Sequence, residues 1–208
     1  MKNDYLRIIW FKRASKYSTD STLINGVFDE LLKNYNSGKR YYHDLSHLID
    51  LLKLLDEVNF QITDEEVVYY AIWFHDAIYE PLKTDNEERS AEWAQSFLSQ
   101  IGFPPHRIEK VCQYILATKN HTSTGENDLN FFLDFDLSIL GAEEMIYDIY
   151  SRQIRDEYHF YPNFLYKRGR KKVLQELLKA ERIYHTEDYY ARLESQSRSN
   201  MDREMSNL

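Results

Sequence analysis

The chain contains few of the residues that form turns and covalent cross-links. Its 208 residues include 6 glycines, 4 prolines and a single cysteine, Cys112. Many-stranded β folds need frequent turns, so this composition disfavours them and favours long helices. One cysteine excludes a disulfide framework within the chain and a cysteine-based zinc site.

Long apolar runs are also missing. No stretch approaches the length of a membrane span, and residues 1–17 interrupt their apolar positions with charged ones instead of forming the apolar block of a signal peptide. We therefore expect a cytoplasmic protein without a membrane segment.

Basic residues are fewer than acidic ones, which gives a formal net charge of -8. General binding to nucleic acid requires a basic surface that displaces counterions, so we do not expect it here. A small phosphorylated ligand needs only a local basic cluster and stays compatible with the composition. The oligomeric state is left open, with a homodimer as one option.

Apolar residues recur at helical spacing through most of the chain, and no linker rich in proline, glycine or serine divides it. We expect an all-α fold with residues 1–208 in a single domain. Its core covers about residues 20–185, with an N-terminal helix and a polar C-terminal tail, ending in a loosely held helix, as extensions.

One segment places an adjacent histidine and aspartate in an apolar helical run. Thr63 and Glu66 have the spacing of a capping box and Pro81 is a stop signal, so the residues between them are expected to form one helix. His75 then falls on the apolar face, and Asp76 lies about 100° further round the helix. A carboxylate at the edge of a core needs a compensating charge, which a metal ion would supply.

Further candidate ligands precede and follow this pair. The segment from Lys39 to Asp50 is expected to open a helix on which His43 and His47, four residues apart, share one side. Asp134 and Asp136 interrupt a later apolar segment, and the residues alone do not decide between them. Imidazole and carboxylate suit manganese, iron, nickel and zinc, and carboxylate also suits magnesium.

The ordered set of His47, the doublet His75-Asp76 and the distant Asp136 resembles the signature of the HD superfamily of metal-dependent phosphohydrolases. The resemblance implies a helical HD-domain fold, these four residues as ligands of a divalent metal ion, and hydrolysis of a phosphate ester through a metal-activated water. The choice of Asp136 over Asp134 rests on this resemblance.

Within that superfamily the chain looks like a family of small proteins described only as predicted HD phosphohydrolases. The resemblance runs from about Arg40 to Tyr184. The stretches that carry it are Tyr42-His43 with His47, 73–79 (WFHDAIY), 86–91 (NEERSA), 136–141 (DLSILG) and 154–158 (IRDEY). It implies no particular substrate, and a small nucleotide-like phosphate is our expectation.

A second resemblance concerns His43. HD-type cyclic-nucleotide phosphodiesterases have a Tyr-His-Asn segment whose histidine donates a proton, with a metal-binding histidine four residues later. Here Asp44 replaces the asparagine. His43 is thus either a general acid or a residue that hydrogen-bonds to a metal-bound carboxylate.

Basic residues near these motifs are candidates for binding the phosphate. We expect Arg155 and Arg170 to stabilise charge that develops on the phosphoryl oxygens. Arg40 and Lys83 are candidate substrate-binding residues, as is His121 in the polar loop that follows residue 118.

Two other functional classes remain open. Some HD-type proteins bind two irons and carry out oxygenation, with additional histidines between the doublet and the last aspartate. His106 and His121 lie in that interval, although the chain has few histidines near the doublet. The other class is a non-catalytic, metal-stabilised helical module that binds a ligand or a partner.

Overall fold

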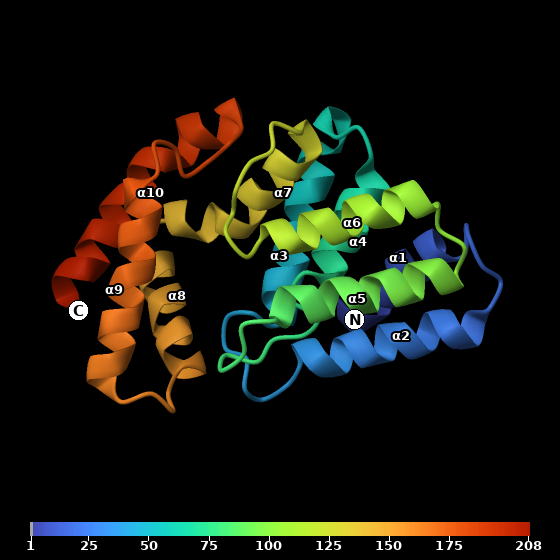
Figure 1. Ribbon diagram of the computed structural model, residues 1–208, viewed down its shortest axis with the longest axis horizontal. Coiled ribbons are helices and arrows are strands. Elements are labelled where there is room, and N and C mark those ends of the chain that lie inside the picture. Colours follow the sequence, from blue (N-terminus) through green and yellow to red (C-terminus); the bar gives the residue numbers. More distant parts are fainter. Residues whose placement is uncertain (1) are drawn as a thin grey trace. The chain divides into compact units, whose positions relative to one another are not determined.

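The computed structural model describes residues 2–208, and within this range the protein is all-α (Figure 1). The helices of the described chain are α1 (Lys2–Ala14), α2 (Ser21–Tyr35), α3 (Leu45–Val58), α4 (Glu65–Phe74), α5 (Asn86–Gln100), α6 (Pro105–Ala117), α7 (Asn127–Leu137), α8 (Glu144–Glu157), α9 (Asn163–Lys179) and α10 (Glu187–Asn207). Two short 3-10 helices complete them, η1 (Asn59–Gln61) and η2 (Ser138–Gly141). The all-α prediction is confirmed.

The helices belong to two compact units, Met1–Thr122 with α1 to α6 and Ser123–Leu208 with α7 to α10. The organisation of the chain as a single domain stays a prediction. A search of the described residues finds no helix that is long and apolar enough to span a membrane.

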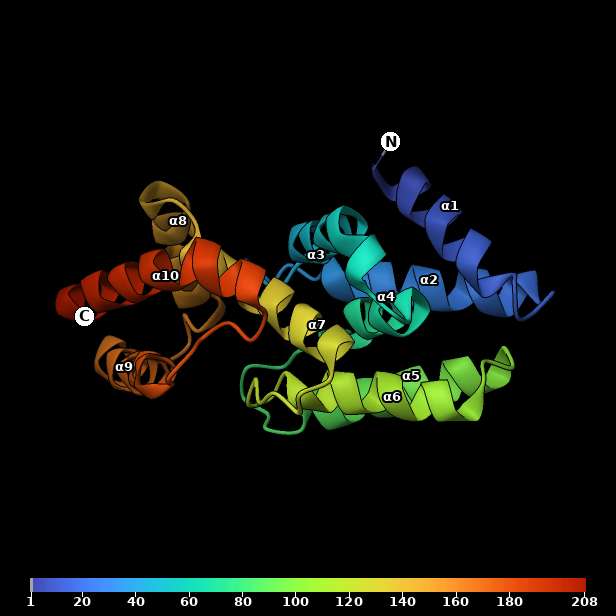
Figure 2. The same cartoon turned by 90° about the horizontal axis from the view of Figure 1, so that it is seen from above.

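The first unit is built around α4, in which every residue from Val67 to Phe74 is buried. A helix that is apolar on all sides belongs in the middle of a core. Trp10 of α1 is fully buried against it, with ring centroids 5.0 Å from Trp73 and 5.1 Å from Phe97. The α5 and α6 helices lie side by side in both views (Figures 1 and 2). The N-terminal helix is therefore part of the core of this unit.

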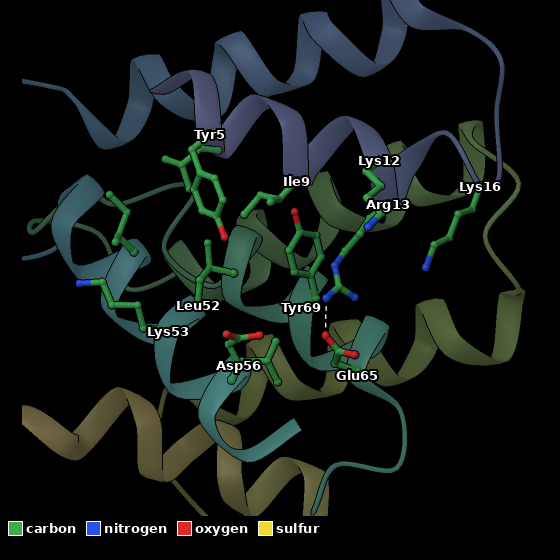
Figure 3. A pocket seen from close by; sticks show the side chains of 13 residues that line it. Tyr5, Ile9, Lys12, Arg13, Lys16, Leu52, Lys53, Asp56, Glu65 and Tyr69 are labelled. Carbon is green, nitrogen blue, oxygen red and sulfur yellow. Dashed lines mark hydrogen bonds and ion pairs between the residues drawn. The ribbon is translucent and has the colours of Figure 1, made fainter. Parts of the chain in front are cut away.

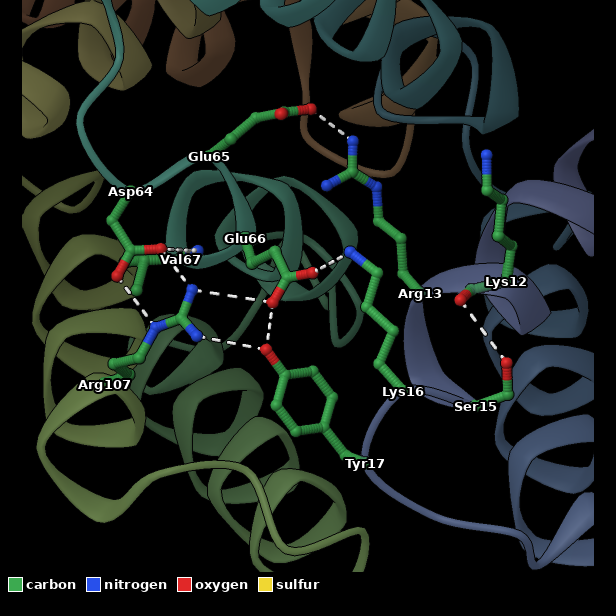
Figure 4. Close-up of polar contacts among 10 residues, drawn as sticks. All are labelled: Lys12, Arg13, Ser15, Lys16, Tyr17, Asp64, Glu65, Glu66, Val67 and Arg107. Carbon is green, nitrogen blue, oxygen red and sulfur yellow. Dashed lines mark hydrogen bonds and ion pairs between the residues drawn. The ribbon is translucent and has the colours of Figure 1, made fainter.

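A polar cluster around Arg107 joins α6 to the start of α4 (Figure 4). Arg107 Nε donates to Asp64 Oδ2 at 2.8 Å, and Arg107 Nη1 donates to the Tyr17 hydroxyl at 3.0 Å. Glu66 accepts hydrogen bonds from Tyr17 and Lys16. These contacts tie together three segments that are distant in the sequence.

Two predicted helix starts were wrong. Asp44 is the N-cap of α3, where its side chain accepts from the Ser46 N–H, so His43 precedes the helix. The N-cap of α4 is Asp64, which accepts from the Val67 N–H, and Glu66 is used by the Arg107 cluster instead of a capping box. Regular α4 ends at Phe74, so the His75-Asp76 pair lies in the turn that follows it.

Polar groups of α10 make specific contacts within the second unit. Asn200 donates to the carbonyls of Leu140 and Ala142, at 2.9 and 2.8 Å. Arg170 and Glu204 form a buried ion pair, with Nε and Oε1 2.8 Å apart. The polar tail predicted to be loosely held is thus a 21-residue helix packed by specific hydrogen bonds.

Candidate metal site

The two histidines His47 and His75 lie next to each other in the first unit. His47 lies in the first turn of α3 and His75 directly follows α4, and their side chains are almost completely buried. Their Nε2 atoms are 3.3 Å apart. The Nδ1 atom of His75 is 2.9 Å from the carbonyl oxygen of Ile72. Because a carbonyl only accepts, Nδ1 carries the proton, and Nε2 of a neutral His75 presents a lone pair toward His47.

Asp76 adds a carboxylate to this pair. Its Oδ2 lies 3.4 Å from Nε2 of His75, and its side chain keeps 19% exposure, so solvent reaches one side of the group. Within the first unit, Nε2 of His75 therefore lies within 3.4 Å of an atom of each of two other predicted ligands, His47 and Asp76. The His/Asp cluster is a candidate metal site.

The geometry of the imidazole pair fits a divalent ion. Two nitrogens that bind one tetrahedral ion at about 2.0–2.1 Å lie about 3.3 Å apart. The observed separation of the two Nε2 atoms has this value, and it also suits a hydrogen bond from a protonated His47 Nε2. Imidazole and carboxylate form the donor set of manganese, iron, nickel and zinc sites.

The fourth predicted ligand, Asp136, lies on α7 in the second unit and is half-buried. His47, His75 and Asp136 each offer one atom of a kind that binds metal. Its neighbour Asp134 is fully buried and accepts hydrogen bonds from the His185 N–H at 2.7 Å and from the N–H and hydroxyl of Thr186 at 2.8 and 2.7 Å. Burial raises the pKa of Asp134, and the three hydrogen bonds oppose that rise. Asp134 therefore has a structural partner in the loop before α10.

The prediction that His43 shares one helical side with His47 was wrong, because His43 lies in the segment before α3. Its ring stacks on that of Tyr79 with centroids 4.5 Å apart, and it is 5.9 Å from the ring of His47. The Tyr42 ring is 4.9 Å from those of both histidines. His43 thus borders the imidazole pair, and its role as a general acid stays a prediction.

Arg40 is buried and holds the backbone around the cluster. Its guanidinium donates to the carbonyl oxygens of His43 at 3.1 Å, Asp76 at 2.6 Å and Ala77 at 3.2 Å. These bonds connect the segment that carries His43 to the turn that carries Asp76. The contacts make Arg40 a positioning residue, and its predicted binding of substrate stays untested.

Three polar side chains, which sequence reasoning did not assign to the site, fix the segment after Asp76. Asn34 donates to the carbonyl of Ala77 at 3.0 Å, and the Ser90 hydroxyl accepts from the Ile78 N–H at 3.0 Å. Asn86 exchanges two hydrogen bonds with the backbone of Glu80. The polar stretch 86–91, noted in the sequence, was the signal that could have found Asn86 and Ser90.

Two other basic residues that were predicted to act on the substrate, Arg155 and Arg170, bond to groups of the second unit. Arg155 donates to the carbonyls of Tyr158 and Tyr161, and Arg170 is paired with Glu204, all within the second unit. The Arg170 ion pair lies among buried side chains. Catalytic roles for Arg155 and Arg170 stay predictions.

Lys83 and His121 lie in loops of the first unit. Lys83 is exposed between α4 and α5, and His121 follows α6 with a φ of 49°. Few residues other than glycine adopt a positive φ, and such positions are common in functional loops. Substrate binding by either residue stays a prediction.

Comparisons with protein-family models, with curated proteins and with solved structures found no match to this chain.

Proposed function

We propose that the protein is a metal-dependent phosphohydrolase, a phosphomonoesterase or phosphodiesterase that acts on a small, nucleotide-like phosphate. The observation that carries the proposal is the pair of buried Nε2 atoms of His47 and His75, 3.3 Å apart, with the carboxylate of Asp76 beside them. The resemblance of these residues to the HD signature supports the same assignment.

In this proposal His47, His75 and Asp76 of the first unit would hold the ion, and Asp136 stays the further ligand that the sequence predicts. The hydrogen bond of His75 Nδ1 to Ile72 keeps Nε2 available as a ligand. The partly exposed Asp76 lies on the side from which water and a substrate oxygen enter. A bound divalent ion supplies an activated water and polarises the phosphoryl group.

The remaining chemistry belongs to residues that border the cluster. His43, held against the Tyr79 ring, gives its proton to the leaving oxygen of the ester. Arg40 keeps the His43 segment and the Asp76 turn in register through its three carbonyl contacts. We make no assignment to Arg155 or Arg170 beyond the sequence prediction.

Among the described residues, neither His106 nor His121 belongs to a cluster of three ligand side chains. The di-iron oxygenase stays an alternative from the sequence. A cytoplasmic location and a homodimer stay expectations from the sequence.

Metal binding is the first test. Chelator-treated wild type, Asp76→Asn and Glu57→Gln are titrated calorimetrically with manganese, nickel and zinc. Glu57 is an exposed carboxylate on α3, the helix that also carries His47, so it is the matched control. We expect Asp76→Asn to weaken binding by at least about tenfold and Glu57→Gln to leave it unchanged. Equal binding by all three proteins would contradict the assignment of Asp76.

Turnover is the second test, on a panel of phosphomonoesters, phosphodiesters and nucleotides with each metal. We expect metal-dependent hydrolysis that Asp76→Asn abolishes. Stoichiometric metal without turnover in the wild type would instead favour a ligand-binding module. If His43 is the proton donor, His43→Asn will slow esters with poor leaving groups far more than nitrophenyl esters, whose departure needs no proton. Equal slowing of both classes would assign His43 to positioning.

A further inference from the structure

A groove in the first unit lies between α1 and α3, with α4 at its base (Figure 3). Its volume is about 540 Å³, which falls within the range of small-molecule sites. None of the candidate metal ligands lines it. The groove is therefore a feature separate from the proposed catalytic site.

The two ends of the groove differ in chemistry because residues along α1 change in character. Tyr5, Leu6 and Ile9 line one end, and Leu52 of α3 faces them. Further along the chain the lining residues include the basic Lys12 and Arg13 of α1 and Lys16 just after it, with the acidic Glu65 of α4 beside Arg13. The distance along the helix from Tyr5 to Lys12 is about 10 Å at 1.5 Å per residue. Lys53 and Asp56 of α3 also line the groove, so its apolar side chains lie among charged ones, and the basic residues of the N-terminal segment gather where α1 ends.

The cations at the basic end are not all neutralised. Arg13 pairs with Glu65, and Lys16 pairs with Glu66. Lys12 forms no ion pair with another described residue, and its side chain is exposed. Arg13 has five N–H donors and Glu65 occupies only part of them. In a chain of net charge -8, this end of the groove attracts an anion.

Tyr69 supplies a second, independent indication of a ligand. Its side chain lines the groove, is 2% exposed, and its hydroxyl has no hydrogen-bond partner among the described residues. Figure 3 shows the hydroxyl directed from α4 toward α1, beside Ile9. A buried hydroxyl without a partner is costly, and a polar head group in the groove would satisfy it.

We propose that this groove binds a medium-chain amphiphile with an anionic head group, of the fatty-acid class. The head group contacts Lys12, Arg13 and the Tyr69 hydroxyl. The aliphatic body lies along Leu6, Ile9 and Leu52. A small molecule is favoured over a protein segment because the volume is that of a ligand pocket and the polar groups converge at one end.

Binding of decanoate, decyl phosphate and decanol to the full chain tests the proposal by calorimetry. We expect one saturable site for decanoate, and much weaker binding of neutral decanol. Tighter binding of decyl phosphate than of decanoate would assign a phosphate head group and keep the amphiphile class. Equal binding of decanoate and decanol would overturn the role of the basic end.

Two variants and one control locate the site. Lys12→Glu should weaken decanoate binding by about tenfold or more, since it removes a charge-assisted contact and adds repulsion. Leu52→Trp should abolish binding by filling the apolar end. Lys33→Glu makes the same charge change at an exposed position of α2, outside the groove, and should have no effect.

Tyr69→Phe separates binding from folding. It should weaken decanoate binding and leave the melting temperature of the ligand-free protein unchanged or raised, because the hydroxyl has no partner to lose. Melting curves of all variants confirm that each is folded. Absence of saturable decanoate binding to the wild type, or equal weakening by Lys12→Glu and Lys33→Glu, would overturn the proposal.

Discussion

At the scale of single residues, Asp134 and Asp136 show how two acids on one helix acquire different roles. Asp134 is fully buried and accepts three hydrogen bonds from the segment that starts α10. Asp136 is half-buried two positions later on α7. The contacts of Asp134 explain its burial without a metal, and the role of Asp136 as a ligand of the proposed ion stays a prediction.

Substitution of each acid by asparagine should separate these roles. Asp134→Asn places an amide N–H₂ among N–H donors, so we expect the unfolding free energy to fall by about 1–3 kcal/mol with metal affinity unchanged. Asp136→Asn should reduce metal affinity. Denaturant titration and metal calorimetry on both variants measure this. Loss of metal affinity in Asp134→Asn alone would reverse the assignment.

At the scale of elements, the contact between η2 and α10 depends on Gly141. A Cβ built on this residue would lie 2.7 Å from Cβ of Leu193, closer than side chains approach one another. Asn200 binds the carbonyls on either side of Gly141, those of Leu140 and Ala142. The missing side chain therefore lets α10 approach closely enough to make these hydrogen bonds.

We expect Gly141→Ala to destabilise the protein by about 1–3 kcal/mol, because the new methyl group forces α10 away from η2. Gly169→Ala is the matched control, since Gly169 lies within α9 and a Cβ there meets no atom within 4 Å. This control should gain about 0.5–1 kcal/mol from its helix propensity. Thermal and denaturant unfolding measure both changes, and equal effects at the two glycines would refute the packing argument.

Sequence periodicity predicted the helices themselves well and their ends less well. Local signals mark some ends, because Gly102 follows α5 with a positive φ and Pro105 begins α6, and neither needs a tertiary partner. The start of α4 did not, because Arg107 and Tyr17, distant in sequence, recruit Asp64 and Glu66. The end of α4 was missed as well: the sequence predicted one helix up to Pro81, whereas α4 ends at Phe74 and His75 and Asp76 lie in the turn after it.

For the candidate site, the sequence indicated the possible ligands but not the residues that position them. His47, His75 and Asp76 stand out by residue type and spacing, and the first unit brings them together. The role of Arg40 was not predictable, because its partners are backbone carbonyls that have no signature in a sequence. The packing of α10 was missed because polar residues were taken as exposed.

At the scale of the whole molecule, each unit contains a partly buried carboxylate with a lowered pKa. Burial raises the pKa of Glu66, but hydrogen bonds from Lys16 and Tyr17 outweigh it. Burial also raises the pKa of Glu204, and hydrogen bonding and charge from Arg170 outweigh it. A carboxyl group whose pKa is lower in the folded state contributes stability above its unfolded pKa of about 4.3, which is lost as the pH falls through the folded pKa.

We therefore expect the unfolding free energy to decrease as the pH falls below about 5. Glu66→Gln should flatten this dependence, since glutamine does not titrate. Glu57→Gln, at the exposed position on α3, should leave it unchanged. Denaturant titrations over a series of pH values measure the slopes, and an undiminished slope in Glu66→Gln would exclude this residue as a cause of acid unfolding.

The aromatic cluster around Trp10 gives the protein an optical property. All three tryptophans, Trp10, Trp73 and Trp93, belong to the first unit, and the rings of Trp10 and Trp73 are 5.0 Å apart at 63°. Indole emission and any exciton signal in circular dichroism therefore report on residues 2–122 alone, whereas the far-ultraviolet helical signal comes from both units. Coincident transitions in the two signals would mean that the units unfold as one cooperative block, and separated transitions would mean that each melts by itself.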